Sequence, residues 1–337
     1  MSKEPILKIK DLKVSFQSQK KFIPAVDGIS FELKEGEILG IVGESGSGKS
    51  VTSLTAMGLI PTPPGKVEKG EIIFDNKDLT TLSEKEWRKI RGNQISMIFQ
   101  EPMTSLNPLF TVGNQLVEAI RLHTDLSKKA ANNRSIELLK LVGIPRAEGI
   151  IKEYPHQLSG GMRQRVMIAM AMACNPKILI ADEPTTALDV TIQAQILALM
   201  KDLNKKTETS IILITHDLGV VSEICERVIV MYSGQIVEQG DVRTILKDPK
   251  HPYTKGLLKS VPDLRGKKDR LYSIPGSVPT PGTIHQGCRF ADRCSESFGR
   301  CRMESPELYQ TEKAGHEVRC FLHTVTERSD NHVEVTS

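Results

Sequence analysis

The 337-residue sequence has no hydrophobic run long enough to cross a membrane, and it carries little net charge. Its longest apolar stretch, VMIAMAMAC at 166–174, is about half of the eighteen or so residues that a membrane span requires. The first residues, MSKEPILKIK, lack the apolar centre of a secretion signal. A net charge of +4 is too small to indicate a nucleic-acid-binding protein. We therefore expect a cytoplasmic protein without a nucleic-acid partner, whose contact with a membrane goes through another protein.

Apolar runs of strand length alternate with Gly-rich turns and helical patterns, which is typical of an α/β fold. Residues 104–175 have helical spacing alone and predict a helical subdomain inserted into the core. A hairpin that turns at Ser233–Gly234 is predicted over 228–241. Continuous apolar runs indicate parallel strands that are buried on both faces, and four are present, at 37–43, 94–100, 177–182 and 210–216.

The composition changes after about residue 250, where prolines cluster and four of the six cysteines lie beyond 287. We predict one domain over 1–250 and a small Pro- and Cys-rich module over 251–337, with its last dozen residues disordered. A reducing compartment argues against disulfides. Four thiolates can hold a tetrahedral Zn²⁺ or a [4Fe–4S] cluster. The spacing C-x5-C-x6-C-x18-C has no tight C-x2-C pair, so unrelated cysteines remain an alternative for Cys288, Cys294, Cys301 and Cys320.

The segment GESGSGKS at 43–50 follows an apolar run, precedes a helical pattern and matches the phosphate-binding pattern G-x-x-x-x-G-K-[ST]. Its glycines let successive backbone N–H groups surround phosphate oxygens, and the helix that begins near Lys49 adds its positive end. Lys49 is expected to reach the β- and γ-phosphates, and Ser50 to bind Mg²⁺. The predicted nucleotide-binding residues here are Gly43, Ser45, Gly46, Gly48, Lys49, Ser50 and Val51.

Polar residues end three of the apolar runs and should therefore meet at one edge of the sheet. Asp182 is expected to hold Mg²⁺ directly or through water, and Glu183 to orient and deprotonate the attacking water. His216 could contact the γ-phosphate and hold the water and Glu183 in place. Gln100 can offer its amide oxygen to Mg²⁺ or to the water. We predict Glu183 and His216 as the catalytic residues of ATP hydrolysis.

A second anion-binding helix start lies at LSGGMRQR, 158–165. Ser159 can cap the helix, and Gly160 and Gly161 permit a close backbone approach. One chain needs only one site for a γ-phosphate, so Ser159 and Gly161 are expected to serve a nucleotide that another chain holds. This predicts a head-to-tail dimer with two ATP molecules between the subunits.

Taken together, these motifs resemble the nucleotide-binding subunits of ABC transporters over roughly residues 5–250. GESGSGKS resembles Walker A, ILIADE at 178–183 Walker B, and LSGGMRQR the ABC signature; Gln100 and His216 are similar to the Q-loop glutamine and the switch histidine. The resemblance implies a P-loop NTPase cassette, with a RecA-like core, antiparallel β structure and an inserted helical subdomain.

The same resemblance adds residues to the expected site. ALD at 187–189 looks like the D-loop and includes Asp189. The signature implies that Gln164, with its neighbours, contacts the ATP of the partner subunit. An aromatic residue upstream of the phosphate loop is expected to stack on adenine; Phe16 is best placed, and Phe22 is the alternative.

Further segments resemble the ATPase subunits of dipeptide, oligopeptide and nickel importers, and they extend the resemblance over almost the whole chain. They are FQEPMTSLNP at 99–108, YPHQLSGGMRQR at 154–165, HPYTKGLL at 251–258 and GCRFADRC at 287–294, followed by Cys301 and Cys320. The resemblance favours an iron–sulfur cluster over zinc at the four cysteines, and it implies that 100–108 contacts the cytoplasmic helices of a permease.

The implied function is ATP hydrolysis that powers import of di- or oligopeptides from the cytoplasmic face of the membrane, with a nickel chelate as an open alternative. The implied partners are two integral-membrane permeases, an extracytoplasmic binding protein and a second ATPase, identical or paralogous. A soluble ABC ATPase acting on nucleic acid or ribosomes is the main rival. Such proteins usually carry two cassettes or long coiled-coil arms, whereas this sequence has one cassette and no sustained heptad repeat.

Overall fold

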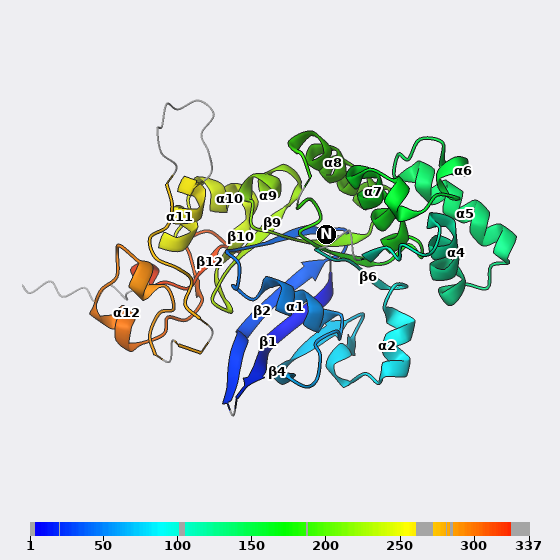
Figure 1. The fold of residues 1–337 in the computed structure, drawn as a ribbon. Coiled ribbons are helices and arrows are strands. Elements are labelled where there is room, and N and C mark those ends of the chain that lie inside the picture. Colours follow the sequence, from blue (N-terminus) through cyan, green and yellow to red (C-terminus); the bar gives the residue numbers. More distant parts are fainter. Residues whose placement is uncertain are drawn as a thin grey trace, which may run out of the picture.

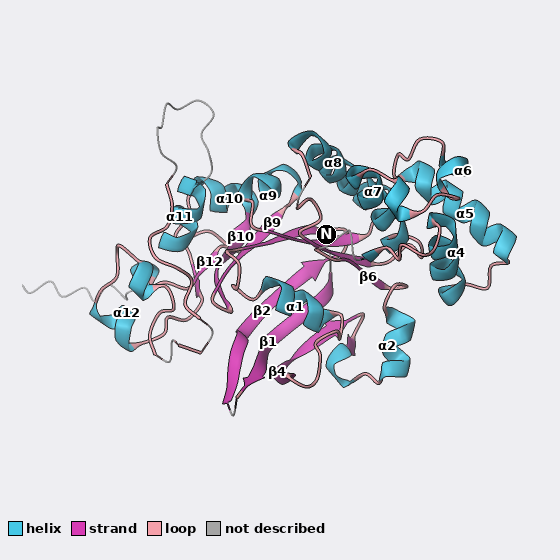
Figure 2. Cartoon of the chain, in the orientation of Figure 1, coloured by secondary structure: helices cyan, strands magenta, loops and turns pink. Residues whose placement is uncertain are grey.

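A computed structural model of the chain describes residues 4–19, 21–100, 105–186, 188–260, 272–280, 282–283 and 286–324. These residues form two β-sheets and helices that cover them (Figure 1, Figure 2). The smaller sheet is antiparallel, and its strands are, in spatial order, β2 (Lys21–Lys34), β1 (Pro5–Ser18), β4 (Gly65–Phe74) and β5 (Lys77–Asp78).

The larger sheet has eight strands and supplies the edge at which the polar residues were expected to meet. In spatial order they are β11 (Tyr309–Gln310), β12 (Glu317–Val318), β10 (Gln235–Asp241), β9 (Arg227–Tyr232), β3 (Ile38–Val42), β8 (Ser210–Thr215), β7 (Ile178–Asp182) and β6 (Ile95–Ile98). The strands from β9 to β6 run parallel to one another. All four predicted apolar runs are strands of this parallel part, which confirms the predicted α/β core.

Neighbouring residues of a parallel strand face opposite sides of the sheet, and both sides are buried. Leu179 and Ala181 of β7 pack in one cluster with helices α7 (Gly160–Ala171), α8 (Val190–Thr207) and α9 (Leu218–Ile224). Ile178 and Ile180 pack in a second cluster with α1 (Lys49–Ala56) and the antiparallel sheet. In Figure 1, α7, α8 and α9 lie above the larger sheet, and α1 lies below it. Because both faces of the sheet are covered, a ligand can reach the sheet at the carboxyl ends of its parallel strands.

Helices occupy the described chain between β6 and β7 and lie at one end of the molecule (Figure 1). Side-chain oxygens at their starts satisfy backbone N–H groups that lack partners inside the helix. Thr111 accepts from Asn114, and Ser127 accepts from Ala130. The helices here are α4 (Val112–His123), α5 (Lys128–Leu141), α6 (Ala147–Ile150), η2 (Pro155–Gln157) and α7; before β6 lie η1 (Leu79–Thr81) and α2 (Glu84–Ile90).

The hairpin of β9 and β10 turns at Ser233–Gly234, as predicted. Both residues have positive φ, 46° and 82°, which is the backbone of a type I′ turn. Behind the hairpin follow α10 (Val242–Lys247), α11 (Pro252–Ser260), η3 (Ala291–Arg293), α12 (Gly299–Met303) and η4 (Phe321–His323).

The C-terminal region is joined to the larger sheet and to its core. Strand β12 pairs with β10, and Tyr253 and Phe290 pack in one cluster with Val42 and Tyr232. The predicted small, separate Cys-rich module is therefore not shown. Strands of two residues have no readable periodicity, so the sequence did not indicate this pairing. The last dozen residues, where disorder was predicted, lie outside the described residues.

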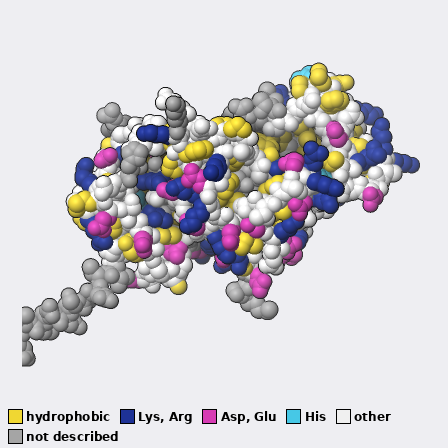
Figure 3. Space-filling model, turned by 90° about the horizontal axis from the view of Figure 1, so that it is seen from below, with side chains coloured by type: hydrophobic (Ala, Val, Ile, Leu, Met, Phe, Trp, Pro, Cys, Tyr) yellow, Lys and Arg dark blue, Asp and Glu magenta, His cyan; other side chains and the backbone are white. Residues whose placement is uncertain are grey.

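In the described part of the chain, no helix is both long enough and apolar enough to cross a bilayer. On the face drawn in Figure 3, basic side chains are interspersed with acidic ones. Such mixing differs from the basic stripe that marks a nucleic-acid-binding face.

Candidate nucleotide-binding site

The phosphate-type loop at 43–50 connects β3 to α1, and its glycines occupy positions that other residues cannot adopt without strain. Gly43 has φ 155°, and a Cβ on it would lie 2.2 Å from the carbonyl oxygen of Met231. Gly48 has φ 100°, and a Cβ there would lie 2.8 Å from the carbonyl oxygen of Ala25. Both clashes are with backbone atoms, so a side chain at either position would displace the loop.

Lys49 is buried and turned back onto its own loop. Its ammonium group donates to the carbonyl oxygens of Gly43, at 2.7 Å, and Glu44, at 3.0 Å. Burial lowers the pKa of Lys49, while the carboxylates of Glu183, Asp182 and Glu44 act in the opposite direction. The side chain thus lies inside the loop that was predicted to hold phosphates.

Asp182, at the end of β7, is only 4% exposed. Burial raises the pKa of its carboxyl group, and a hydrogen bond from the Ser50 hydroxyl opposes that shift. Its Oδ1 atom is buried and has no hydrogen-bond partner among the described residues. A buried carboxylate oxygen that lacks a partner, beside a serine hydroxyl, fits the oxygen ligands that Mg²⁺ prefers.

Glu183 follows β7 with φ 48°, a left-handed backbone that is rare for a residue with a side chain. Its N–H donates to the carbonyl oxygen of Ile214 at 2.9 Å, which holds this conformation. The carboxylate accepts hydrogen bonds from Gln100 Nε2, at 3.0 Å, and from Thr186 Oγ1, at 2.9 Å. Its other oxygen lies 3.2 Å from Nδ1 of His216.

This arrangement brings together three residues that the sequence predicted at the sheet edge, Gln100, Glu183 and His216. Burial raises the pKa of Glu183, but hydrogen bonds from His216 and Thr186 outweigh it, so that its pKa lies below the ordinary value. A carboxylate at neutral pH can accept a proton from water. Thr186 was missed, although a hydroxyl three residues after an acid could have suggested the contact.

The signature segment begins α7, with Ser159 and Gly160 exposed. Ser159 caps the helix by accepting from the N–H of Met162, and a Cβ on Gly161 would lie 3.0 Å from Ile192 of α8. Gln164 lies one turn further along α7, and its side chain is fully buried. Its contact with the ATP of another subunit stays a prediction.

Three predicted residues have contacts that leave their assigned roles as predictions. Asp189 caps α8 by accepting from the N–H of Ile192 at 2.9 Å, and Ala187 of the same segment lies outside the described residues. Phe16 is partly buried against the second core cluster. Phe22 is 48% exposed, with the ammonium group of Lys66 5.7 Å from its ring centre.

The four C-terminal cysteines line one small cavity, and all are free thiols. Burial raises the pKa of Cys288, Cys294 and Cys320, the last to about 12. Among the described residues, however, no three His, Cys, Asp or Glu side chains converge closely enough to hold a metal ion. The predicted zinc ion or iron–sulfur cluster is therefore not supported by this arrangement.

Two family models match the chain. Residues 26–186 match the model for the ABC transporter, and residues 237–301 match the model for the C-terminal region of oligopeptide/dipeptide transporters. The first match contains the phosphate loop, the signature and Glu183. The second contains most of β10, all of α11 and three of the four C-terminal cysteines.

Named relatives are similar over nearly their whole length. The oligopeptide transport ATP-binding protein AppD of Bacillus subtilis (strain 168) is 58% identical over 318 residues, which are 94% of this chain and 97% of that protein. The dipeptide transport ATP-binding protein DppD of Escherichia coli (strain K12) is 52% identical over 303 residues, 90% of this chain and 92% of that protein.

Solved structures of ATP-binding cassettes have the same fold. The dimeric cassette MJ0796, bound to ADP and Pi in a post-hydrolysis state, is 31% identical with a TM-score of 0.63, over 70% of this chain and 99% of that one. The cassette cbiO1 of Clostridium perfringens, part of the transporter complex cbiONQ, is 30% identical with a TM-score of 0.63, over 73% of this chain and 92% of that one. The chain belongs to the ABC transporter family, as an ATPase of the group of oligopeptide and dipeptide transport ATP-binding proteins.

Proposed function

We propose that this ATPase powers the import of di- and oligopeptides across the cytoplasmic membrane. The observation that carries the proposal is the position of Glu183, whose carboxylate is held by three side chains beside the phosphate loop. The transport of peptides rests on the similarity to AppD and DppD and on the matching C-terminal region.

The residues of this chain have distinct roles in the proposed reaction. Loop N–H groups and Lys49 hold the β- and γ-phosphates of ATP. Glu183 takes a proton from the attacking water while the oxygen of that water bonds to the γ-phosphorus. The bond between the γ-phosphorus and the β–γ bridging oxygen breaks, and ADP leaves. His216 and Gln100 keep the carboxylate and the water in line. Ser50 and Asp182 would hold Mg²⁺, which neutralises phosphate charge when bound.

Ser159 and Gly161 are proposed to contact the γ-phosphate of a nucleotide held by a second ATPase subunit. The exposure of Ser159 and Gly160 at the start of α7 supports this, because the N-terminal end of a helix attracts phosphate. The dimeric form of the MJ0796 cassette, a relative of this chain, supports a paired arrangement. The second subunit is either another copy or a paralogue, and the pair would enclose two ATP molecules.

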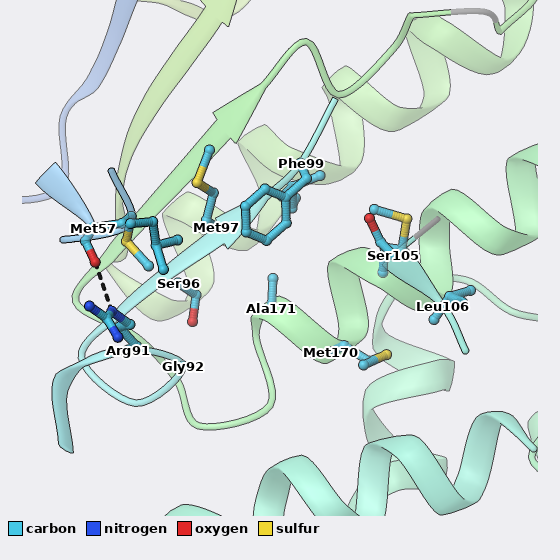
Figure 4. Close-up of a pocket in the computed structure, with 13 residues that line it drawn as sticks. Met57, Arg91, Gly92, Ser96, Met97, Phe99, Ser105, Leu106, Met170 and Ala171 are labelled. Carbon is cyan, nitrogen blue, oxygen red and sulfur yellow. Dashed lines mark hydrogen bonds between the residues drawn. The ribbon is translucent and has the colours of Figure 1, made fainter. Parts of the chain in front are cut away.

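An apolar pocket beside Gln100 is the proposed contact with the permeases. It has a volume of about 310 Å³ and lies between β6 and α7. In Figure 4, Met97 and Phe99 lie on one side of the pocket and Met170 and Ala171 of α7 lie on the other, and Arg91 donates to the carbonyl oxygen of Met57. Phe99 is 43% exposed. A short amphipathic helix of a permease would bury these methionine and phenylalanine side chains, one residue away from Gln100.

The four cysteines are proposed to hold a [4Fe–4S] cluster, as the sequence resemblance favoured. Backbone N–H groups donate to three of the thiols, at Cys288, Cys294 and Cys320, which stabilises thiolates. The arrangement of the described thiols does not itself indicate a metal site. The proposal therefore rests on the sequence resemblance and on the ligand type, because four cysteine thiolates are the usual ligands of such a cluster. Iron and sulfide analysis of anaerobically prepared protein, with its absorbance spectrum, tests this assignment.

Transport is the decisive test. Membrane vesicles would contain the chain, its two permeases and its second ATPase, with the extracytoplasmic binding protein and labelled peptide outside. We expect ATP-dependent uptake of di- or oligopeptide that is lost with Glu183→Gln and kept with Glu208→Gln, an exposed control. Uptake of a nickel chelate without peptide would reassign the substrate. Recovery of the tagged chain on ribosomes or DNA, without permeases, would refute a transport function.

A further inference from the structure

The phosphate loop contains a carboxylate, Glu44, next to the place where a negatively charged nucleotide binds. Glu44 directly follows Gly43, and its main-chain carbonyl oxygen already accepts from Lys49 at 3.0 Å. An unpaired carboxylate here would repel phosphate. Residues of the C-terminal region neutralise the Glu44 carboxylate and hold it in place.

Arg293, at the end of η3, forms a two-pronged contact with the Glu44 carboxylate. Its Nη1 lies 2.7 Å from one carboxylate oxygen, and its Nη2 lies 3.1 Å from the other. The same guanidinium group donates to the carbonyl oxygen of Pro275 at 2.8 Å and to the hydroxyl of Tyr232 at 3.3 Å. The Arg293 side chain is only 5% exposed, whereas that of Glu44 is 31% exposed, so the arginine end of this charge-assisted pair is buried and the carboxylate is partly open to solvent.

Two further contacts hold the loop from the same direction. The backbone N–H of Glu44 donates to the hydroxyl of Tyr253, on α11, at 2.8 Å. The N–H of Gly234, in the β9–β10 turn, donates to the carbonyl oxygen of Ser47 at 2.9 Å. Arg289 binds that turn through the carbonyl oxygen of Ser233. Both the backbone and the side chain of Glu44 are thus held by residues more than 200 positions later in the chain.

We infer that Arg293 is a positioning residue for the phosphate loop, which holds the Glu44 carboxylate away from the nucleotide and thereby sets the affinity for ATP. The inference rests on the proposed binding of ATP to this loop. It gives the C-terminal region a part in nucleotide binding, because Tyr253 and Arg293 both lie in the segment that matches the oligopeptide/dipeptide C-terminal model.

The position of Arg293 in the chain links this contact to the cysteines. Arg293 directly precedes Cys294, and Arg289 directly follows Cys288. The two thiols line the same cavity, so the loop between them carries both arginines.

A double-mutant cycle tests the inference on the full-length, anaerobically prepared chain. Arg293→Gln leaves Glu44 unpaired, and we expect the dissociation constant of this variant for a fluorescent ATP analogue to rise at least about tenfold, because an unneutralised carboxylate in the loop repels the phosphates. Arg293→Gln combined with Glu44→Gln should recover most of the affinity, since no charge is then left unpaired. The rescue separates a positioning role from general damage to the fold.

Arg302→Gln is the matched control. Arg302 also adjoins a cysteine, Cys301, but its ion pair with Asp292 is exposed and does not involve the phosphate loop. We expect this variant to bind the nucleotide as the parent chain does. The thermal midpoint, measured on every variant, shows whether each one is folded.

Each outcome is informative. If Arg293→Gln is folded and binds the nucleotide with unchanged affinity, the inference is refuted. It is also refuted if Glu44→Gln fails to restore the affinity of a folded Arg293→Gln chain. Two other outcomes would refute the proposed nucleotide site itself: the parent chain does not bind the analogue, or Lys49→Ala binds it as tightly as the parent does.

Discussion

Replacement of Glu183 by glutamine removes one negative charge from a site whose other contacts can persist. The carboxylate accepts from Gln100 and Thr186 on one oxygen and lies against Nδ1 of His216 on the other. The introduced amide can place its oxygen toward Gln100 and Thr186 and donate its N–H₂ to the ring nitrogen of His216. We therefore expect a free energy of unfolding within about 1 kcal/mol of the parent value.

The rate of hydrolysis should fall far more than the stability. An amide does not accept a proton from water at neutral pH, and loss of a positioned general base typically costs about 10²- to 10⁴-fold in rate. That range corresponds to about 3–5 kcal/mol in the activation free energy. Binding of MgATP should be kept, because Lys49, Ser50 and Asp182 are unchanged. The ATP-bound dimer should therefore persist instead of reopening.

Single-turnover release of phosphate at saturating MgATP measures the chemical step. Gel filtration with labelled ATP detects the retained nucleotide and the dimer. Glu208→Gln, an exposed change, controls for the loss of one charge. Hydrolysis by Glu183→Gln at the parent rate would refute the role of Glu183. Loss of ATP binding in a folded variant would show that the carboxylate acts in binding rather than in catalysis.

Three further predictions test the loop, the C-terminal core and the permease contact. Gly43→Ala should abolish ATP binding and lower the denaturation midpoint more than Gly46→Ala does. A Cβ at 43 would lie 2.2 Å from the carbonyl oxygen of Met231, whereas a Cβ at 46 would have no other atom within 4 Å. Equal effects of the two substitutions would refute the steric argument. Burial lowers the pKa of His251 to about 4, so the free energy of unfolding should decrease as the pH falls from about 6.5 toward 4, by at most about 3 kcal/mol. In urea unfolding, His251→Gln should lose less stability over this pH range than the parent does. An unchanged pH dependence would contradict the role of His251. Phe99→Asp should weaken co-purification of the permeases while the ATPase activity of the isolated chain persists. Leu122→Asp, at another exposed apolar position, should leave both unchanged, and equal co-purification of the two variants would exclude the pocket as the contact.

Much of the parallel core could be predicted because each strand is a continuous apolar run with its own boundaries. Asp182, Glu183 and His216 follow such runs, and parallel strands bring their carboxyl ends to one edge, so their proximity followed from the order of motifs alone. The Ser233–Gly234 turn was readable for a similar reason. Both of these residues have positive φ, and such a two-residue turn is specified by residues that are adjacent in the sequence.

Contacts between distant segments could not be predicted in this way. Arg293 and Glu44 are 249 positions apart, and neither belongs to a periodic pattern that points to the other. The burial of Gln164 depends on how α7 is turned against its neighbours, which a signature motif does not specify. The cysteine spacing gave the type of ligand, but the distances among the four thiols depend on loops without regular structure.

The folded-back position of Lys49 has a consequence for how the loop meets its ligand. Its ammonium group has already left bulk water and is satisfied by main-chain oxygens of Gly43 and Glu44. An arriving triphosphate exchanges one set of hydrogen bonds for another, and no hydrated cation has to be stripped of its solvent shell. The loop therefore fixes its own lysine with its main-chain oxygens, and the binding of phosphates needs no separate dehydration of that ammonium group.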